Sequence, residues 1–351
     1  MLELLKRGKA LLSKDNMLTS SKVVLTAYGY YITLKVSFMI VKKIHESIAS
    51  KVTIYRVSKR SLQNVFADNA GKWAVVSGAG SGIGFEMAKL LNLCNFNVVA
   101  VDKNPEKIGK LVEQLYSDLR KTKIVGLQID FKKDAAKVIF EKLENCMSEN
   151  NIDNINLLVN NVGTCKLAPF ISSGYQEIID ELKVNLSSHM ALTTFFRNRI
   201  NRSRFENYSG IIFVGDNLGS VAVPGYRTYP YAKALLHSVS KYIGRTHQDY
   251  FDSMIVVPSQ VLTQSNNPQK HTTPDYTKVD LASLGFGWAT AADCAKQTFL
   301  NFGLTGITGG VPRHEELRLL LPYYEFFVRL RMLRRVQKLM EGEPANIVNN
   351  L

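Results

Sequence analysis

The sequence predicts an α/β protein organised around a doubly wound, parallel β-sheet. Three observations predict this fold class. The composition, with 46% hydrophobic and 21% charged residues in a chain of 351, is typical of a globular protein. From residue 71 onward, short apolar runs alternate with longer segments of helical periodicity. The runs are continuously apolar, as parallel strands buried on both faces are.

The expected elements follow one another as strand and helix along the chain. We expect strands at Trp73–Ser77, Asn97–Val101, Ile124–Ile129, Ile155–Asn160, Gly210–Val214 and Met254–Val257. We expect helices at Ile83–Leu93, Pro105–Leu119, Ala135–Glu149, Tyr175–Arg197 and Tyr231–Tyr250. Right-handed crossovers between such strands give a doubly wound sheet whose ligand lies beyond the strands' carboxyl ends.

The chain divides into three parts by composition. Residues 1–70 form a basic leader with a hydrophobic segment, 71–315 the α/β domain, and 316–351 a C-terminal amphipathic helix and tail. The net charge is +14, and residues 1–72 hold 13 Lys and Arg against four acids. These cations flank an apolar run instead of alternating with aromatics on a folded face. This arrangement points to anionic lipid or to a targeting signal, so we expect a membrane surface as partner, and no nucleic acid.

The apolar run is Val23–Val41, between Lys22 and Lys42. Its 19 residues would rise about 28 Å as a helix, barely the thickness of a hydrocarbon core. Lys35 lies inside the run and would cost about 3 kcal/mol near mid-bilayer unless it snorkels. Three interpretations stay open: an interfacial or re-entrant anchor, a true span, and a helix packed on the protein. Membrane contact is favoured.

Cysteine and histidine spacing points away from metal chemistry. The four cysteines are far apart and contain no CxxC pair, which indicates free thiols in a reducing compartment. The six histidines never reach HxxxH or HxxE spacing. We therefore expect no metal site.

A glycine-rich turn links the first strand to the first helix. It reads SGAGSGIG from Ser77 and stands between a predicted strand and a predicted helix, the context that a dinucleotide-binding turn requires. Glycines let the backbone approach a pyrophosphate, and the free N–H groups of the helix face the phosphates. The expected cofactor-binding residues of the turn are Gly78, Gly80, Ser81, Gly82, Ile83 and Gly84.

Polar residues at the ends of the next strands complete the expected cofactor site. Asp102 follows Gly84 by eighteen residues and can accept hydrogen bonds from the adenosine ribose, which favours NAD. Lys103 could instead attract a 2′-phosphate, so NADP stays open. Asp130 ends the third strand, within reach of the adenine. The fourth strand ends in Asn160-Asn161-Val162-Gly163, where Asn160, Asn161 and Gly163 border the cofactor.

Tyr229 and Lys233 occur in the segment YPYAK, which opens a predicted helix. Their i, i+4 spacing places them on one face. A phenol with an unperturbed pKa near 10 is a poor acid–base at neutral pH. A neighbouring ammonium stabilises the phenolate and lowers this pKa, so we expect Lys233 to tune Tyr229 for proton transfer.

These motifs carry a family resemblance over about Gly71–His314. The set SGAGSGIG, NNVG, Asn185 and YPYAK resembles the short-chain dehydrogenase/reductase superfamily, which has a Rossmann-type fold. WAVVSGAGSGIG, LLVNNVG and GLTGITGGVPRH resemble more narrowly the 17-beta-hydroxysteroid dehydrogenase and very-long-chain ketoacyl-CoA reductase branch. The sequence is most similar to the hydroxysteroid dehydrogenase-like subgroup, some of whose members are regarded as inactive.

The resemblance implies a reaction and its residues. A carbonyl is reduced by hydride from a nicotinamide cofactor, NAD or NADP, while Tyr229 delivers the proton. Lys233 would bind the ribose and tune Tyr229, and Asn185 would hold the water of a proton relay. Thr263 would contact the nicotinamide side, in a cofactor-binding segment that also includes Pro258 and Val261.

Asp216 departs from the family pattern. The family places a serine thirteen residues before the catalytic tyrosine, and this chain has Asp216 there. An ionised aspartate has no proton to donate to the substrate oxygen, and its charge would raise the pKa of Tyr229. Protonation of Asp216, or donation by Asn217 or Ser220, could compensate. We expect a weakened oxidoreductase, with a catalytically silent, cofactor-binding scaffold or sensor at a membrane as the alternative.

The resemblance also implies a lipophilic substrate, a steroid or a long-chain acyl compound, and a homodimer as one assembly. Gln264–Leu284 occupies the usual place of a substrate lid. Glu316–Met340 reads as a surface helix or as an interfacial helix that admits substrate from a membrane. The branch suggests the endoplasmic reticulum and the subgroup suggests mitochondria, and the basic leader favours mitochondria.

Overall fold

The computed structural model describes residues 14–66, 70–116, 122–166, 168, 170–200, 209–221, 225–264, 266 and 287–319. The chain forms two units, Met1–Ile54 and Tyr55–Leu351. The start of the basic leader, most of the expected lid and the C-terminal segment from residue 320 lie outside the described residues. Predictions made for those segments stay predictions.

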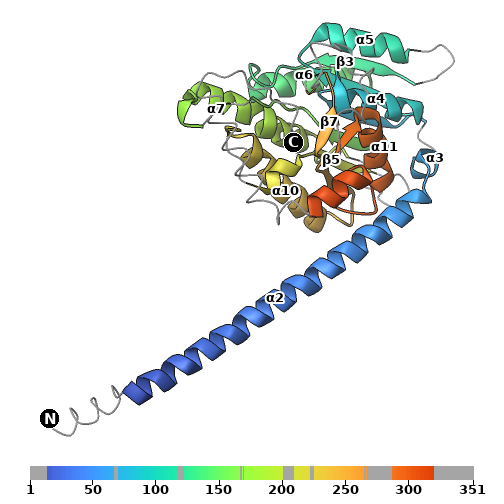
Figure 1. Cartoon of the computed structure of the whole chain (residues 1–351). Coiled ribbons are helices and arrows are strands. Elements are labelled where there is room, and N and C mark those ends of the chain that lie inside the picture. Colours follow the sequence, from blue (N-terminus) through green and yellow to red (C-terminus); the bar gives the residue numbers. More distant parts are fainter. Residues whose placement is uncertain are drawn as a thin grey trace. The chain divides into compact units, whose positions relative to one another are not determined.

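The described part of the first unit is most of one long helix, α2 (Lys14–Ser58), seen in blue in Figure 1. The described side chains between residues 26 and 42 are all exposed, and Leu34 and Phe38 are each 70% exposed. Across the described ranges, no helix combines the length and the apolarity that a membrane crossing requires.

The second unit is built on a parallel sheet with the strand order β3-β2-β1-β4-β5-β6-β9. Its strands are β1 (Trp73–Ser77), β2 (Asn97–Asp102), β3 (Ile124–Gln128), β4 (Leu157–Asn160), β5 (Gly210–Val214), β6 (Asp252–Val256) and β9 (Ile307–Thr308). The order reverses between β1 and β4, which opens a crevice at their carboxyl ends. The predicted doubly wound parallel sheet is confirmed.

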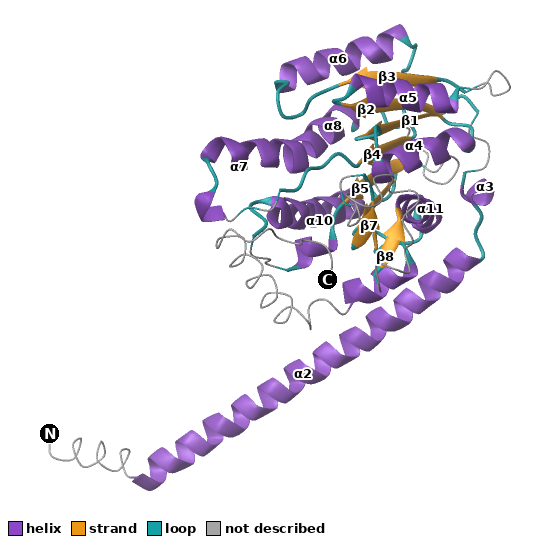
Figure 2. Cartoon of the chain, turned by 45° about the horizontal axis from the view of Figure 1, so that its top comes forward, coloured by secondary structure: helices purple, strands orange, loops and turns teal. Residues whose placement is uncertain are grey.

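Helices cover both faces of this sheet (Figure 2). On one face lie α4 (Gly82–Leu93), α5 (Pro105–Leu115) and α11 (Ala291–Asn301). The other face carries α6 (Ala136–Glu149), α8 (Ser188–Phe196) and α10 (Tyr229–Thr246). Successive β1 residues point to opposite faces, so Val76 joins the first core and Val75 the second. Both apolar faces are thereby buried, as the continuously apolar strands predict.

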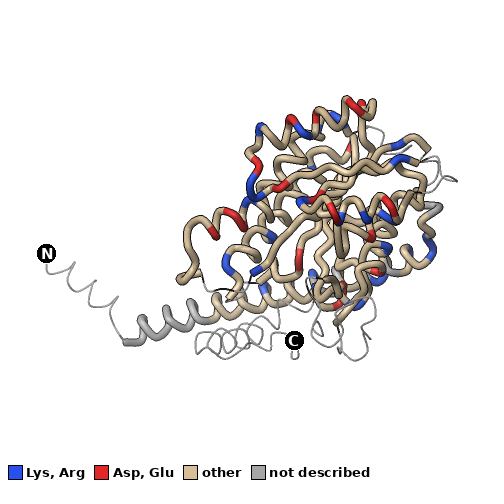
Figure 3. Tube along the Cα trace, turned by 90° about the horizontal axis from the view of Figure 1, so that it is seen from above, with Lys and Arg blue, Asp and Glu red and all other residues tan. Residues whose placement is uncertain are grey.

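Charge on this unit is mixed. Lys and Arg are interspersed with Asp and Glu along the chain in Figure 3.

The start of α5 is fixed by its own residues. The Asn104 side chain accepts a hydrogen bond from Lys107 N at 3.1 Å and caps the helix, and Pro105 occupies its first position.

The structure corrects several expected boundaries. The helix expected at Tyr175–Arg197 is divided into α7 (Tyr175–Leu182), a π-helical turn η2 (Lys183–Ser187) and α8. β9 and the small sheet of β7 (Gln260–Leu262) and β8 (Trp288–Thr290) were not expected, because two or three residues are too few to show a pattern. α10 begins at Tyr229, two residues early, since proline is tolerated in a first turn.

Candidate active site

The glycine turn between β1 and α4 is packed so closely that side chains are excluded. A Cβ at Gly84 would lie 2.2 Å from the carbonyl oxygen of Gly78 and 2.3 Å from Asn161 Nδ2. Gly78 itself has a φ of +67°, which favours glycine. Asn161 Nδ2 donates to the carbonyl oxygens of Ser77, at 2.9 Å, and Gly78, at 3.2 Å. The structure thus brings the NNVG motif against the glycine turn.

The start of α4 offers free backbone donors. Its N-cap Ser81 makes no side-chain capping bond, so the first N–H groups of the helix, at Gly82 and Ile83, keep their capacity for an anion. Thr263 lies across the turn, because a Cβ at Gly82 would stand 3.0 Å from Thr263 Cγ2. Val261 is buried in β7 just before it.

Asp102 lies beside the same turn. Its carboxylate accepts from Gly80 N and Asn104 N, each at 3.0 Å. Lys103 is exposed, and Asp130 is held in the turn after β3, where its Oδ1 accepts from Lys132 N at 3.0 Å. The sites expected for the ribose and the adenine thus follow neighbouring strands, β2 and β3, at one edge of the crevice.

This donor and acceptor set fits a dinucleotide. The turn has no side chain where a pyrophosphate would approach, free N–H groups point from α4, and an acid stands at the end of β2. A bound nicotinamide cofactor supplies or accepts the hydride. The residues of the turn and the strand ends would hold its phosphates and ribose.

Lys233 projects from the first turns of α10 into the core. It is 3% exposed, and its Nζ donates to the carbonyl oxygen of Val214 at 2.8 Å. Burial lowers the pKa of Lys233 to about 8, although the Asp216 carboxylate opposes this. Its Nζ lies 5.5 Å from the centre of the Tyr229 ring. The predicted tyrosine and lysine therefore lie side by side, Lys233 buried and Tyr229 partly exposed.

Asp216 takes the hydrogen bond of the tyrosine. Tyr229 Oη donates to Asp216 Oδ2 at 2.8 Å, and Leu218 N donates to Asp216 Oδ1 at 2.7 Å. Burial raises the pKa of the Asp216 carboxyl above its ordinary value. Burial and then the Asp216 charge raise the pKa of Tyr229 well above 10. The expectation that Asp216 raises the Tyr229 pKa agrees with this arrangement, whereas the lowering expected from Lys233 does not prevail, because desolvation and the carboxylate both raise it.

Asn185 completes the group from the π-helical turn η2. Its Oδ1 accepts from Thr164 N at 2.9 Å and its Nδ2 donates to Thr164 O at 2.7 Å. A Cβ at Gly163 would lie 3.1 Å from Asn185 Oδ1 and 3.5 Å from Lys233 Nζ. Asn185 and Lys233 therefore flank Gly163, the last residue of the NNVG motif.

Two further residues predicted to bind the cofactor form hydrogen bonds that connect neighbouring elements. Asn160 is fully buried, with Nδ2 donating to Thr193 Oγ1 at 2.9 Å, so it ties β4 to α8 and does not face the crevice. The carbonyl oxygen of Pro258 accepts from Asn217 N at 3.0 Å, which joins the segment after β6 to the turn that carries Asp216.

Sequence reasoning missed four residues near this group. His189 is buried one helical turn after Asn185, bonds Val162 O through Nε2 at 2.7 Å, and has its pKa lowered to about 3, mainly by burial. Cys165 is exposed, and partial desolvation by neighbouring groups, with the negative charges of Asp216 and Glu181, raises the pKa of its thiol. Glu181 Oε2 accepts from Thr228 N at 3.1 Å. Arg227 is 4% exposed. Only Cys165 had a sequence signal, its position two residues after the NNVG motif.

Comparison with known proteins agrees with this geometry. The family profile described as short chain dehydrogenase matches residues 72–274. The very-long-chain 3-oxoacyl-CoA reductase of Schizosaccharomyces pombe is 28% identical over 274 residues, which is 75% of this chain and 77% of that protein. The Mycosarcoma maydis protein of the same name is 29% identical over 56% of this chain and 53% of its own length.

Solved structures share the fold. The 3-ketoacyl-(acyl-carrier-protein) reductase from Brucella melitensis, complexed with NADH, has a TM-score of 0.56 at 20% identity, over 68% of this chain and 95% of that one. A short chain dehydrogenase from Burkholderia cenocepacia in complex with NADP has a TM-score of 0.56 at 19% identity, over 69% and 98%. The glycine turn, the Tyr229–Lys233 pair and the matched family profile together assign the chain to the short-chain dehydrogenases, a family of oxidoreductases that use nicotinamide cofactors.

Proposed function

We propose that this protein reduces the 3-keto group of a long-chain acyl thioester with NADH or NADPH, and that Asp216 slows the reaction at neutral pH. The observation that carries the proposal is the partly buried group in which Tyr229 Oη donates to Asp216 Oδ2 beside Lys233. The substrate class rests on the relatives named very-long-chain 3-oxoacyl-CoA reductase.

The residues of the site act on the proton. In the reduction, the substrate carbonyl carbon gains a hydride and its oxygen becomes an alkoxide, which takes one proton to give the alcohol. Tyr229 is placed to give that proton, and Lys233 stabilises the phenolate that remains. Asn185, across Gly163 from Lys233, is the residue that would hold the water returning this proton.

Asp216 opposes this step in its charged form. The phenolic proton is directed at the carboxylate, and a second negative charge beside it disfavours loss of that proton. A protonated Asp216 is a donor instead, and burial favours that form. The protonation state of Asp216 thus decides whether the pair resists or assists the transfer.

The test is cofactor oxidation by the purified full chain with a long-chain 3-oxoacyl-CoA, against Tyr229→Phe and against a steroid ketone. We expect turnover of the thioester that is lost in Tyr229→Phe, which removes only the hydroxyl. Faster turnover of the steroid ketone would indicate that the substrate is a steroid, the other substrate class of this branch, and not an acyl thioester.

A catalytically silent, cofactor-binding scaffold is the second candidate, and the Tyr229–Asp216 hydrogen bond favours it. Titration of NADH and NADPH separates the two. Saturable binding without turnover, in the wild type and at acidic pH alike, supports the scaffold. Turnover that disappears in Tyr229→Phe contradicts it.

We propose further that residues 1–70 attach the α/β domain of residues 71–315 to a membrane surface. Exposed aromatic and aliphatic side chains of α2, among them Tyr28, Leu34 and Phe38, support this. Flotation of the full chain with vesicles, compared with a chain lacking residues 1–54, tests it. The comparisons give no support for a mitochondrial location, and a homodimer stays a prediction.

A further inference from the structure

A second cavity lies away from the candidate active site. It is open to solvent on one side and is lined by the C-terminal half of α10, the first residues of β6 and the segment 303–307, and its volume is about 620 Å³. Lys241 lies twelve residues after Tyr229, about 18 Å along the helix. Asp252 and Ser253 in its wall begin β6, whereas the cofactor crevice lies at the strands' carboxyl ends. The two sites are therefore distinct.

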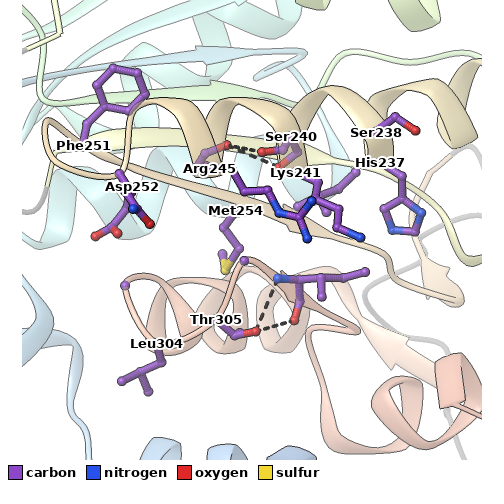
Figure 4. A pocket seen from close by; sticks show the side chains of 17 residues that line it. His237, Ser238, Ser240, Lys241, Arg245, Phe251, Asp252, Met254, Leu304 and Thr305 are labelled. Carbon is purple, nitrogen blue, oxygen red and sulfur yellow. Dashed lines mark hydrogen bonds between the residues drawn. The ribbon is translucent and has the colours of Figure 1, made fainter. Parts of the chain in front are cut away.

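Cationic groups of α10 point into this cavity. Lys241 and Arg245 are one helical turn apart, and Figure 4 shows their side chains extending with His237 toward the segment that carries Thr305. Among the described residues, no ion pair or hydrogen bond holds either cationic head group. Asp252 is the one acid among the lining residues. The wall therefore carries more positive than negative charge.

His237 adds a buried polar atom that lacks a partner. Its Nε2 is buried without a hydrogen bond in the described structure. Burial, and then the charges of Arg318 and Lys241, lower the pKa of His237, so the ring is neutral at neutral pH. A neutral imidazole can donate one hydrogen bond. A buried polar atom of this kind is normally satisfied by water or by a ligand.

The rest of the wall mixes apolar side chains with polar ones, among them Ser240, Gln248 and Thr305. Phe251, Met254 and Ile255 come from the end of the α10–β6 connection and from β6, and Leu304 and Ile307 from the opposite segment. Phe251 and Met254 are almost completely buried, at 5% and 1% exposed. The cavity thus combines apolar side chains with a cationic rim, and its volume lies within the roughly 300–1,000 Å³ of small-molecule sites.

We propose that this cavity binds an amphiphilic anion, with a carboxylate or phosphate head between Lys241 and Arg245 and an apolar body against Met254 and Leu304. Arginine and lysine hold such heads by charge-assisted hydrogen bonds, and the guanidinium can bind both oxygens at once. A free fatty acid and an alkyl phosphate share this chemistry. The proposal is independent of whether the active site turns over.

Calorimetric titration of the full chain with dodecanoate and with dodecyl phosphate tests the proposal. We expect one saturable site for at least one of them, weakened about tenfold in Lys241→Gln and about a hundredfold in Lys241→Gln/Arg245→Gln. The ligand that binds more tightly identifies the head group. Tyr229→Phe and saturating NADPH should leave the affinity unchanged, since the sites are distinct.

The matched control is Lys110→Gln/Lys123→Gln, which removes the same charge from exposed lysines of α5 and of the residue before β3. It retains α2, so amphiphile taken up by that helix is equal in all variants. The proposal is overturned if neither anion binds saturably, if the α10 double variant binds like this control, or if 1-dodecanol displaces the anions with equal affinity.

Discussion

Replacing Asp216 by serine is expected to raise the rate of 3-ketone reduction about a hundredfold at neutral pH. In the wild type, Tyr229 Oη donates to Asp216 Oδ2 at 2.8 Å, so the proton needed by the substrate is directed at a carboxylate. Serine removes the charge and supplies a hydroxyl donor.

The magnitude follows from two effects. At this separation and an effective dielectric constant of about 20, a carboxylate opposes a phenolate by at most about 6 kcal/mol, which Lys233 partly offsets. One well-placed donor to a developing oxyanion contributes about 10²–10³ in rate. We take the lower end, because the Tyr229 pKa is raised by burial before it is raised by Asp216.

The substitution should leave the fold intact. Asp216 Oδ1 accepts from Leu218 N at 2.7 Å at the start of the 3-10 turn η3 (Asn217–Ser220), and serine is also a good capping residue. Single-turnover reduction at saturating cofactor, with the cofactor Kd measured separately, gives the chemical step. Asp216→Asn is the control, since it removes the charge and keeps the shape, and we expect a smaller gain. Equal or slower reduction by the serine variant, at unchanged cofactor affinity, would refute the reasoning.

The remaining predictions concern pH, packing and cofactor choice. Wild-type kcat should rise as the pH falls through the raised pKa of Asp216, and Asp216→Asn should lack this rise. Above about pH 8, kcat should fall, because Lys233 loses its proton. The folded state holds the Asp216 proton more tightly than the unfolded state. Its contribution to stability is therefore complete below the unfolded pKa and lost as the pH rises through the folded one, as thermal unfolding against pH would show. Gly84→Ala should lower the free energy of unfolding by about 1–3 kcal/mol and abolish NADH binding, because the new Cβ would meet backbone at 2.2 Å. Gly109→Ala, with nothing within 4 Å, should instead stabilise α5 by about 0.5–1 kcal/mol in denaturant unfolding. Asp102→Ser should weaken NADH about tenfold and favour NADPH, and equal Kd values in fluorescence titrations would contradict the role given to this carboxylate.

Most of the sheet could be predicted because its strands carry their own signal. Trp73–Ser77 and Gly210–Val214 are continuous apolar runs, and the structure gives β1 and β5 the same bounds. β9 has only two residues, and it forms because β6 leaves an unpaired edge beside it. The π-helical turn that holds Asn185 is equally invisible in the sequence, since a single widened turn does not alter the periodicity around it.

The sequence by itself determined the fold class, the glycine turn and the presence of Tyr229, Lys233 and Asp216 at family spacing, because periodicity and motif spacing are local properties of the chain. Only the tertiary structure decided how these groups act on one another. It places the Asp216 carboxylate 2.8 Å from the phenol, in a partly buried position beside the buried Lys233. The size and sign of a pKa shift depend on desolvation and on distances between segments far apart in sequence, and folding alone sets these.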